Sequence, residues 1–165
     1  MSNNNRRHNN RCETFRHIET VRNYINIFVR EFLHRGEHHD QTKLENFEAK
    51  LFEEVTHELR GLTYGTEAYE MSLKKLEPAL KHHYANNRHH AEHHVKGIRG
   101  MNIIDIMEML CDWKASSLRQ NDGNILLSLK ENQERYGFSD ELYEIFENTF
   151  EWLDNEEVFH RADQS

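Results

Sequence analysis

Residues 82–94, HHYANNRHHAEHH, carry six of the chain's thirteen histidines, and the rest of the sequence is organised around them. Neutral imidazole is the commonest metal ligand in proteins, and clustered imidazoles gain little unless an ion holds them together. A transition-metal site built on this run needs several helices to converge on it. The alternative is a solvated, histidine-rich loop, because biased composition also arises without a function.

Outward from this run, the other candidate ligands lie far apart along the chain. His17 stands on an apolar helical stripe, where a lone histidine is often a hydrogen-bonded core residue. The adjacent pair His39 and Asp40 offers a nitrogen and an oxygen ligand, and Lys43 can direct an ammonium to the same place. Asp112 lies in a strongly apolar segment, where an unpaired charge is costly.

Length and composition favour one soluble, helical domain. The chain has 165 residues, one proline and 30% charged residues, which favours long amphipathic helices. Its net charge of −8 gives no general attraction to nucleic-acid backbones. Neither a signal peptide nor an apolar run of about 20 residues is present, so we expect no membrane span. Cys12 and Cys111 are typical of free thiols in a reducing, cytoplasmic compartment.

Hydrophobic spacing predicts an all-α fold of about six helices. We expect these at about residues 14–35, 44–59, 66 to the histidine run, 103–118, 124–136 and 140–154. Pro78 should divide the third, and turns are expected at Gly61–Gly65 and at Asp122-Gly123. A disordered polar tail (1–12), a helical domain (13–154) and a frayed acidic tail (155–165) complete the predicted organisation.

The helix expected at 103–118 carries three carboxylates, Asp105, Glu108 and Asp112, beside its apolar stripe. The predicted core stripe consists of Ile104, Met107, Cys111, Ala115 and Leu118. The three carboxylates need a metal, a histidine or an arginine as partner, unless they stand at the solvent boundary.

In order along the chain, these ligands resemble the H…HD…D signature of the HD superfamily of metal-dependent phosphohydrolases. The matching residues are His17, His39, Asp40 and Asp112, and Lys43 adds the HDxxK extension of many members. Two-metal members supply two further histidines in between, where His83 and either His89 or His90 fall.

A closer resemblance covers about residues 14–150 and is to an uncharacterised family common in phages and bacteria. It is carried by the segments HHDQTKL, TYGTEAY, LKHHYANNRHHAEHH and MNIIDIMEMLCDWKAS. Ala91 stands where that family has proline and Thr42 where it has serine, and neither change removes a ligand. The resemblance implies a single-domain, HD-like helical bundle with one or two metal ions, in a phage-like or bacterial cytosol.

The resemblance also implies a role for each candidate residue. Ligands without thiolate suit Mn, Fe, Co, Ni or Zn. The implied ligands are His17, His39, Asp40, Asp112, His83 and one of His89 and His90. Phosphoryl oxygens would be held by Lys43, Arg88 and His93, and the ligands oriented by Asn87, Glu92, Asp105 and Glu108. His82 and His94 are expected to face solvent or to lie behind the ligands.

The expected function is a metal-dependent phosphohydrolase acting on a small phosphoester, with a nucleotide as the leading substrate class. Two alternatives use the same residues: a di-iron oxygenase on the HD scaffold, and a noncatalytic module that a metal stabilises. The sequence is compatible with an oligomer.

Overall fold

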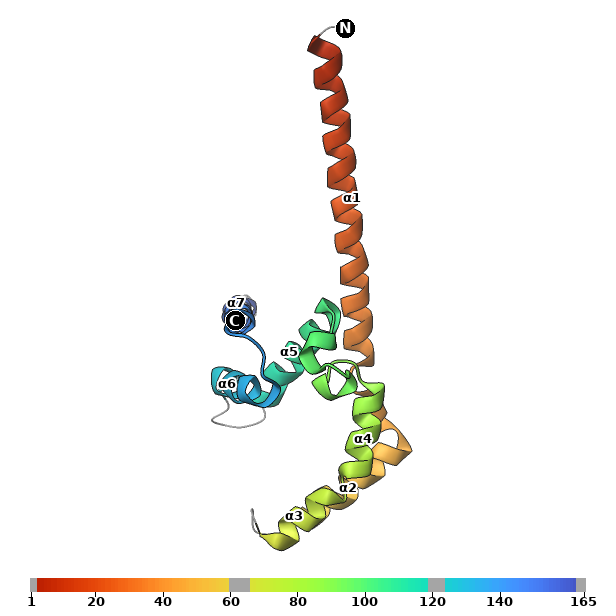
Figure 1. Ribbon diagram of the computed structural model, residues 1–165, viewed down its shortest axis with the longest axis vertical. Coiled ribbons are helices and arrows are strands. Elements are labelled where there is room, and N and C mark those ends of the chain that lie inside the picture. Colours follow the sequence, from red (N-terminus) through yellow and green to blue (C-terminus); the bar gives the residue numbers. More distant parts are fainter. Residues whose placement is uncertain (1–2, 60–65, 119–123, 163–165) are drawn as a thin grey trace. The chain divides into compact units, whose positions relative to one another are not determined.

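The computed structural model describes residues 3–59, 66–118 and 124–162, and its contacts divide the chain into two units, Met1–His39 and Asp40–Ser165. The described residues form seven α-helices and three short 3-10 helices, with no strand among them (Figure 1). The predicted all-α class is therefore confirmed. The turns expected at Gly61–Gly65 and Asp122-Gly123 lie outside the described residues.

The first unit is dominated by one helix, α1 (Asn3–His38). It begins well before Thr14, so residues 3–12 are helical where we expected a disordered tail, and it continues past Gly36. Once a helix is nucleated, each further residue adds one hydrogen bond, so polar residues can extend it. The unit has no second helix on which α1 could bury its apolar stripe.

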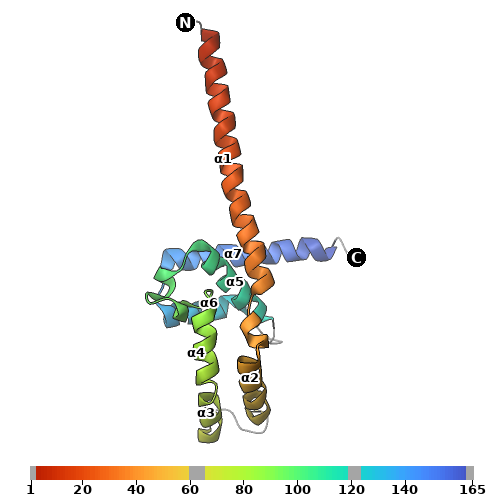
Figure 2. The same cartoon turned by 90° about the vertical axis from the view of Figure 1, so that its right-hand side faces the viewer.

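In the second unit, α2 runs beside α3 and α4, which follow each other as two parts of a divided helix (Figure 2). Its elements are η1 (Gln41–Leu44), α2 (Asn46–Leu59), α3 (Glu67–Lys74), α4 (Glu77–Asn86), η2 (Ala91–His93), η3 (Gly97–Gly100), α5 (Ile103–Ser117), α6 (Ile125–Tyr136) and α7 (Asp140–Ala162). Pro78 lies in the first turn of α4, where its missing N–H costs nothing, so the predicted division is confirmed.

The main core of this unit lies where α5, α6 and α7 pack together. Its fully buried side chains include Leu129, Phe146 and Phe150. The Trp113 ring stacks on Tyr136 with 7° between the ring planes. On α7, Phe146 and Phe150 face this core, whereas Ile145 is 57% exposed.

The core stripe predicted for α5 is mostly wrong. Met109 and Leu110 fill the core, whereas Cys111 and Leu118 are exposed. Asp105 is fully buried, so the helix turns part of its acidic side inward. This side of α5 can face inward because Arg88 and His89 are polar partners for Asp105 and Glu108. Hydrophobic periodicity alone does not reveal such partners.

The chain after α6 departs from expectation in one respect. Gly137 ends α6 with a φ of 64°, a conformation that glycine adopts without strain. The helix that follows, α7, runs to Ala162 and so includes much of the expected acidic tail.

Within the residues that the structure covers, no helix combines the length and apolar character needed to cross a bilayer.

Candidate metal centre

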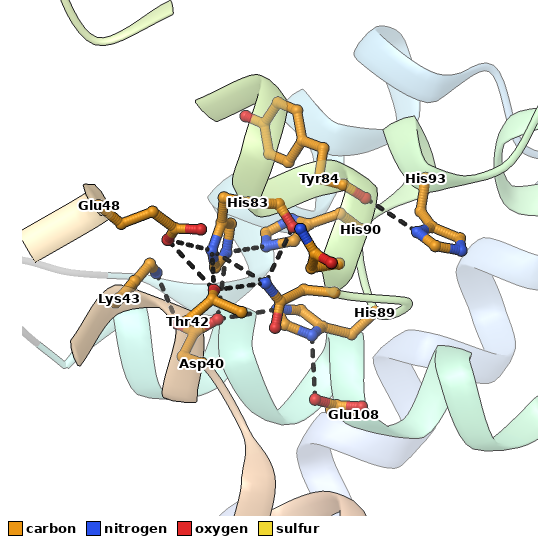
Figure 3. Close-up of polar contacts among 12 residues, drawn as sticks. Asp40, Thr42, Lys43, Glu48, His83, Tyr84, His89, His90, His93 and Glu108 are labelled. Carbon is orange, nitrogen blue, oxygen red and sulfur yellow. Dashed lines mark hydrogen bonds and ion pairs between the residues drawn. The ribbon is translucent and has the colours of Figure 1, made fainter. Parts of the chain in front are cut away.

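Four side chains of the second unit, Asp40, His83, His89 and His90, place one ligand atom each within 4.8 Å of all the others (Figure 3). Asp40 precedes η1, His83 lies on α4, and the other two lie in the segment between α4 and η2. The structure therefore combines both His89 and His90 with His83, where the sequence left a choice between them.

The backbone at Asp40 is unusual, with a φ of 56° and a ψ of 17°. This left-handed conformation costs a non-glycine residue about 1 kcal/mol or more, and such strain concentrates at functional sites. The strained backbone thus lies directly at the candidate ligand.

The ligand atoms are as close to one another as a shared ion would require. Asp40 Oδ1 lies 3.2 Å from His83 Nε2 and 3.4 Å from His89 Nε2, and the Nε2 atoms of His83 and His90 are 2.9 Å apart. Tetrahedral zinc with bonds of about 2.0–2.1 Å has its ligand atoms about 3.3 Å apart. The four donors could thus hold a metal ion.

The protonation states also suit a cation. Burial, together with the imidazoles of His89 and His83, lowers the pKa of His90 to about 3, against an opposite effect of Asp112 and Asp40. Burial alone would raise the pKa of the Asp40 carboxyl, but contacts with His83, His89 and Lys43 hold it well below its usual range. A neutral imidazole and an ionised carboxylate are the forms that bind metals.

The two most buried histidines are held in the same way. His83 Nδ1 lies 3.0 Å from Glu48 Oε2, and His89 Nδ1 lies 2.9 Å from Glu108 Oε1. In each ring the other nitrogen, Nε2, faces Asp40 (Figure 3). A carboxylate behind a histidine fixes its tautomer and orientation, which is the usual arrangement around metal ligands.

Asn87, for which an orienting role is predicted, lies in a hydrogen-bond network beside His83. Its amide donates to the hydroxyl of Thr42 at 2.8 Å and to the carbonyl oxygen of His83 at 2.9 Å. The Thr42 hydroxyl in turn donates to Glu48 at 3.1 Å. The residue that replaces serine in this chain therefore keeps the hydroxyl that the network uses.

Two further predicted residues lie at the cluster. Lys43 Nζ is 2.5 Å from Asp40 Oδ2, so its ammonium stands beside the candidate ligands. Asp112 on α5 is half-buried, and a carboxylate oxygen of Asp112 lies within 4.8 Å of one of Asp40. The roles of both residues near a cation stay predictions.

His17 and His39 belong to the first unit, whereas the four residues of the cluster belong to the second. Because residues 3–38 form one continuous helix, His17 lies about 30 Å along its axis from His38. The roles of His17 and His39 in a metal site therefore stay predictions.

Arg88 and Asp105 form a two-point ion pair at 3.1 and 3.0 Å. Asp105 also completes a capping box with Asn102 at the start of α5. These contacts tie the histidine segment to α5. The roles that the resemblance implies, phosphate binding for Arg88 and ligand orientation for Asp105, stay predictions.

His93, His94 and Glu92 also have structural contacts. His93 Nδ1 donates to the carbonyl oxygen of Tyr84 at 2.9 Å, and His94 Nε2 to that of Arg88 at 2.9 Å. Glu92 accepts from Arg135 at 2.7 Å, which joins η2 to α6. For His93 and Glu92 these contacts favour a structural role over the roles implied by the resemblance.

Glu48 is the site residue that the sequence reasoning missed. Its side chain is fully buried on α2, whereas the apolar Leu44 and Phe47 nearby are 75% and 51% exposed. The sequence does contain a signal for the burial of Glu48. It lies four residues before Phe52 and seven before Val55, which places it on the same helical face as these apolar residues.

The chain belongs to a family of unknown function (DUF5662), whose profile matches residues 6–156. This confirms the predicted membership of an uncharacterised family. No curated protein and no solved structure matches the chain significantly.

Proposed function

We propose that this protein is a metal-dependent phosphohydrolase of the cytosol that acts on small phosphoesters, with nucleotides the first class to test. The observation that carries the proposal is the convergence of three imidazole nitrogens and one carboxylate oxygen, each from a buried or half-buried side chain. The order of the candidate residues along the chain, which resembles the HD signature, supports the same chemistry. An analogy of fold alone would not support it, because one fold can carry many functions.

Asp40, His83, His89 and His90 would hold the ion, and Asp112 is close enough to Asp40 to join them. A divalent metal supplies Lewis acidity toward a phosphoryl oxygen and lowers the pKa of a bound water toward neutrality. Mn, Fe, Co, Ni and Zn all suit this nitrogen and oxygen donor set.

Lys43 is the residue that we assign to the substrate. Its side chain is 37% exposed and is anchored only three residues from Asp40, so its ammonium can reach an oxygen of a phosphoryl group beside the ligands. A fixed positive charge there would stabilise the charge that develops on the transferred group. Arg88 is not included, because Asp105 engages two of its guanidinium nitrogens.

A second candidate is a structural metal module without catalysis. Four protein ligands fill a tetrahedral shell, as structural zinc sites do, whereas a catalytic ion keeps a position open for water or substrate. The four-residue cluster is compatible with this arrangement.

One experiment separates the two candidates. Protein purified without a histidine tag would be analysed for bound metals and then assayed for phosphate release from a nucleotide and phosphomonoester panel with added Mn²⁺, Co²⁺, Ni²⁺ or Zn²⁺. We expect metal-dependent release that is lost in Asp40→Ala. Bound metal without release from any substrate, together with loss of helicity on chelation, would favour the structural module.

A further inference from the structure

Glu48 occupies a position that neither the histidine cluster nor the resemblance explains. It is fully buried on α2, and each oxygen has its own imidazole partner: Oε1 lies 2.6 Å from His82 Nδ1 and Oε2 lies 3.0 Å from His83 Nδ1. A buried carboxylate is costly unless such partners satisfy it. One glutamate thus joins a part-exposed histidine to a buried candidate ligand.

The hydrogen-bond directions around this glutamate can be assigned. The Asn87 amide donates to Thr42 Oγ1, so the Thr42 hydroxyl keeps its own proton for Glu48 Oε2. The Thr42 hydroxyl and the Asn87 amide also lie 3.0 Å from His83 Nδ1. Their protons are directed to Glu48, to Thr42 and to the carbonyl oxygen of His83, so His83 presents Nδ1–H to the Glu48 carboxylate. A neutral His83 then has its lone pair on Nε2, the atom that faces Asp40 and His90.

We propose that Glu48 is the positioning residue of the metal centre: it fixes His83 in the tautomer and orientation that point Nε2 at the ion, with Thr42 holding the carboxylate in place. The inference rests on the proposed metal site and goes beyond it, because it assigns a metal-affinity role to a residue that contacts no substrate. Loss of such a supporting group typically weakens metal binding 10- to 100-fold.

The matching contact of Glu108 with His89 makes the assignment specific. Each carboxylate supports a different ligand, so replacing Glu48 should disturb His83 and leave the support of His89 in place. A glutamine at position 48 keeps the shape of the side chain but offers a single acceptor oxygen to two imidazoles.

The test is metal affinity by calorimetry and the visible absorption spectrum of the Co²⁺-loaded protein. We expect Glu48→Gln to bind Co²⁺ about 10- to 100-fold more weakly and with a changed ligand-field spectrum. The matched control is Glu53→Gln, which alters an exposed glutamate of the same helix and should leave both readouts unchanged.

A second pair of variants decides the question even if Glu48→Gln does not fold. Thr42→Val, which removes the hydroxyl donor, should weaken Co²⁺ binding about fivefold, the worth of one hydrogen bond. Thr42→Ser keeps the hydroxyl and should restore wild-type affinity. Wild-type protein that binds no metal would overturn the proposed function and this inference together. Tight wild-type binding with an unchanged affinity and spectrum in Glu48→Gln and Thr42→Val would overturn this inference alone.

Discussion

Lys43 and an incoming cation compete for the same carboxylate. The ammonium lies 2.5 Å from Asp40 Oδ2, while Oδ1 of the same side chain faces the imidazoles of His83 and His89. Unlike the charge of a buried group, that of Lys43 is partly screened by solvent. The charge of Lys43 therefore weakens cation binding moderately. We expect Lys43 to contribute instead to the reaction of the substrate.

This competition predicts opposite effects of Lys43→Gln on binding and on catalysis. Removing a positive charge a few Å from a divalent ion relieves roughly 1–2 kcal/mol of repulsion, so metal affinity should rise about 5- to 30-fold. Phosphate release should fall at saturating metal, because the substrate loses a charge partner. Calorimetry and a steady-state assay check this, with Lys50→Gln on α2 as control. Weaker metal binding in Lys43→Gln would contradict the argument.

His90 predicts a pH dependence of the metal-free protein. Its pKa is about 3 in the fold and about 6.5 in an unfolded chain, so the unfolded chain binds more protons between those values. The contribution of neutral His90 to the free energy of unfolding is therefore complete above about pH 6.5 and is lost as the pH falls toward 3.

Urea unfolding at pH 7 and at pH 5 measures this contribution. We expect His90 to account for about 1–2 kcal/mol of the difference in the free energy of unfolding. The variant His90→Gln should show a correspondingly shallower pH slope. Equal slopes for the two proteins would mean that His90 is protonated in the fold at pH 5.

At the scale of elements, the sequence predicts the helix boundaries at Pro78 and Asn102 but not the buried face of α5. Pro78 and Asn102 act through local backbone chemistry, and the division before α4 and the start of α5 lie where these residues predict them. The inward face of α5 could not be predicted from periodicity, because Arg88 and His89, distant in the chain, are what satisfy Asp105 and Glu108. Tertiary partners, and not local propensity, decide which side of that helix is buried.

The ion pair between Arg88 and Asp105 gives a prediction about the stability of the fold. Arg88→Ala would leave the buried Asp105 carboxylate without its two-point partner, and we expect the free energy of unfolding to fall by about 2 kcal/mol, a value reduced for the exposure of Arg88. The KM for any phosphoester substrate should stay unchanged. The exposed Arg99→Ala is the control. A raised KM without loss of stability would return Arg88 to the phosphate-binding role implied by the resemblance.

At the scale of the whole molecule, the candidate centre combines side chains from three segments of the second unit. Asp40 precedes η1, His83 lies on α4, and Asp112 lies on α5, beside the core of α6 and α7. Sequence order could identify these ligands as candidates but could not show that His89 and His90 both reach His83. An ion bound at this point would link the α2–α4 part of the second unit to the α5–α7 part.

Metal binding should therefore stabilise the entire second unit. A ligand at 100 times its Kd adds about 2.7 kcal/mol to the free energy of unfolding, which for a chain of this size raises Tm by about 5–10 °C. Thermal unfolding followed by circular dichroism, with chelator or with added Co²⁺ or Zn²⁺, measures the shift. Asp40→Asn should lose it while keeping helicity, because the substitution removes a charged ligand and preserves shape. An equal Tm rise in wild type and Asp40→Asn would place the stabilising ion elsewhere on the protein, since only a site that uses the Asp40 carboxylate loses affinity in that variant.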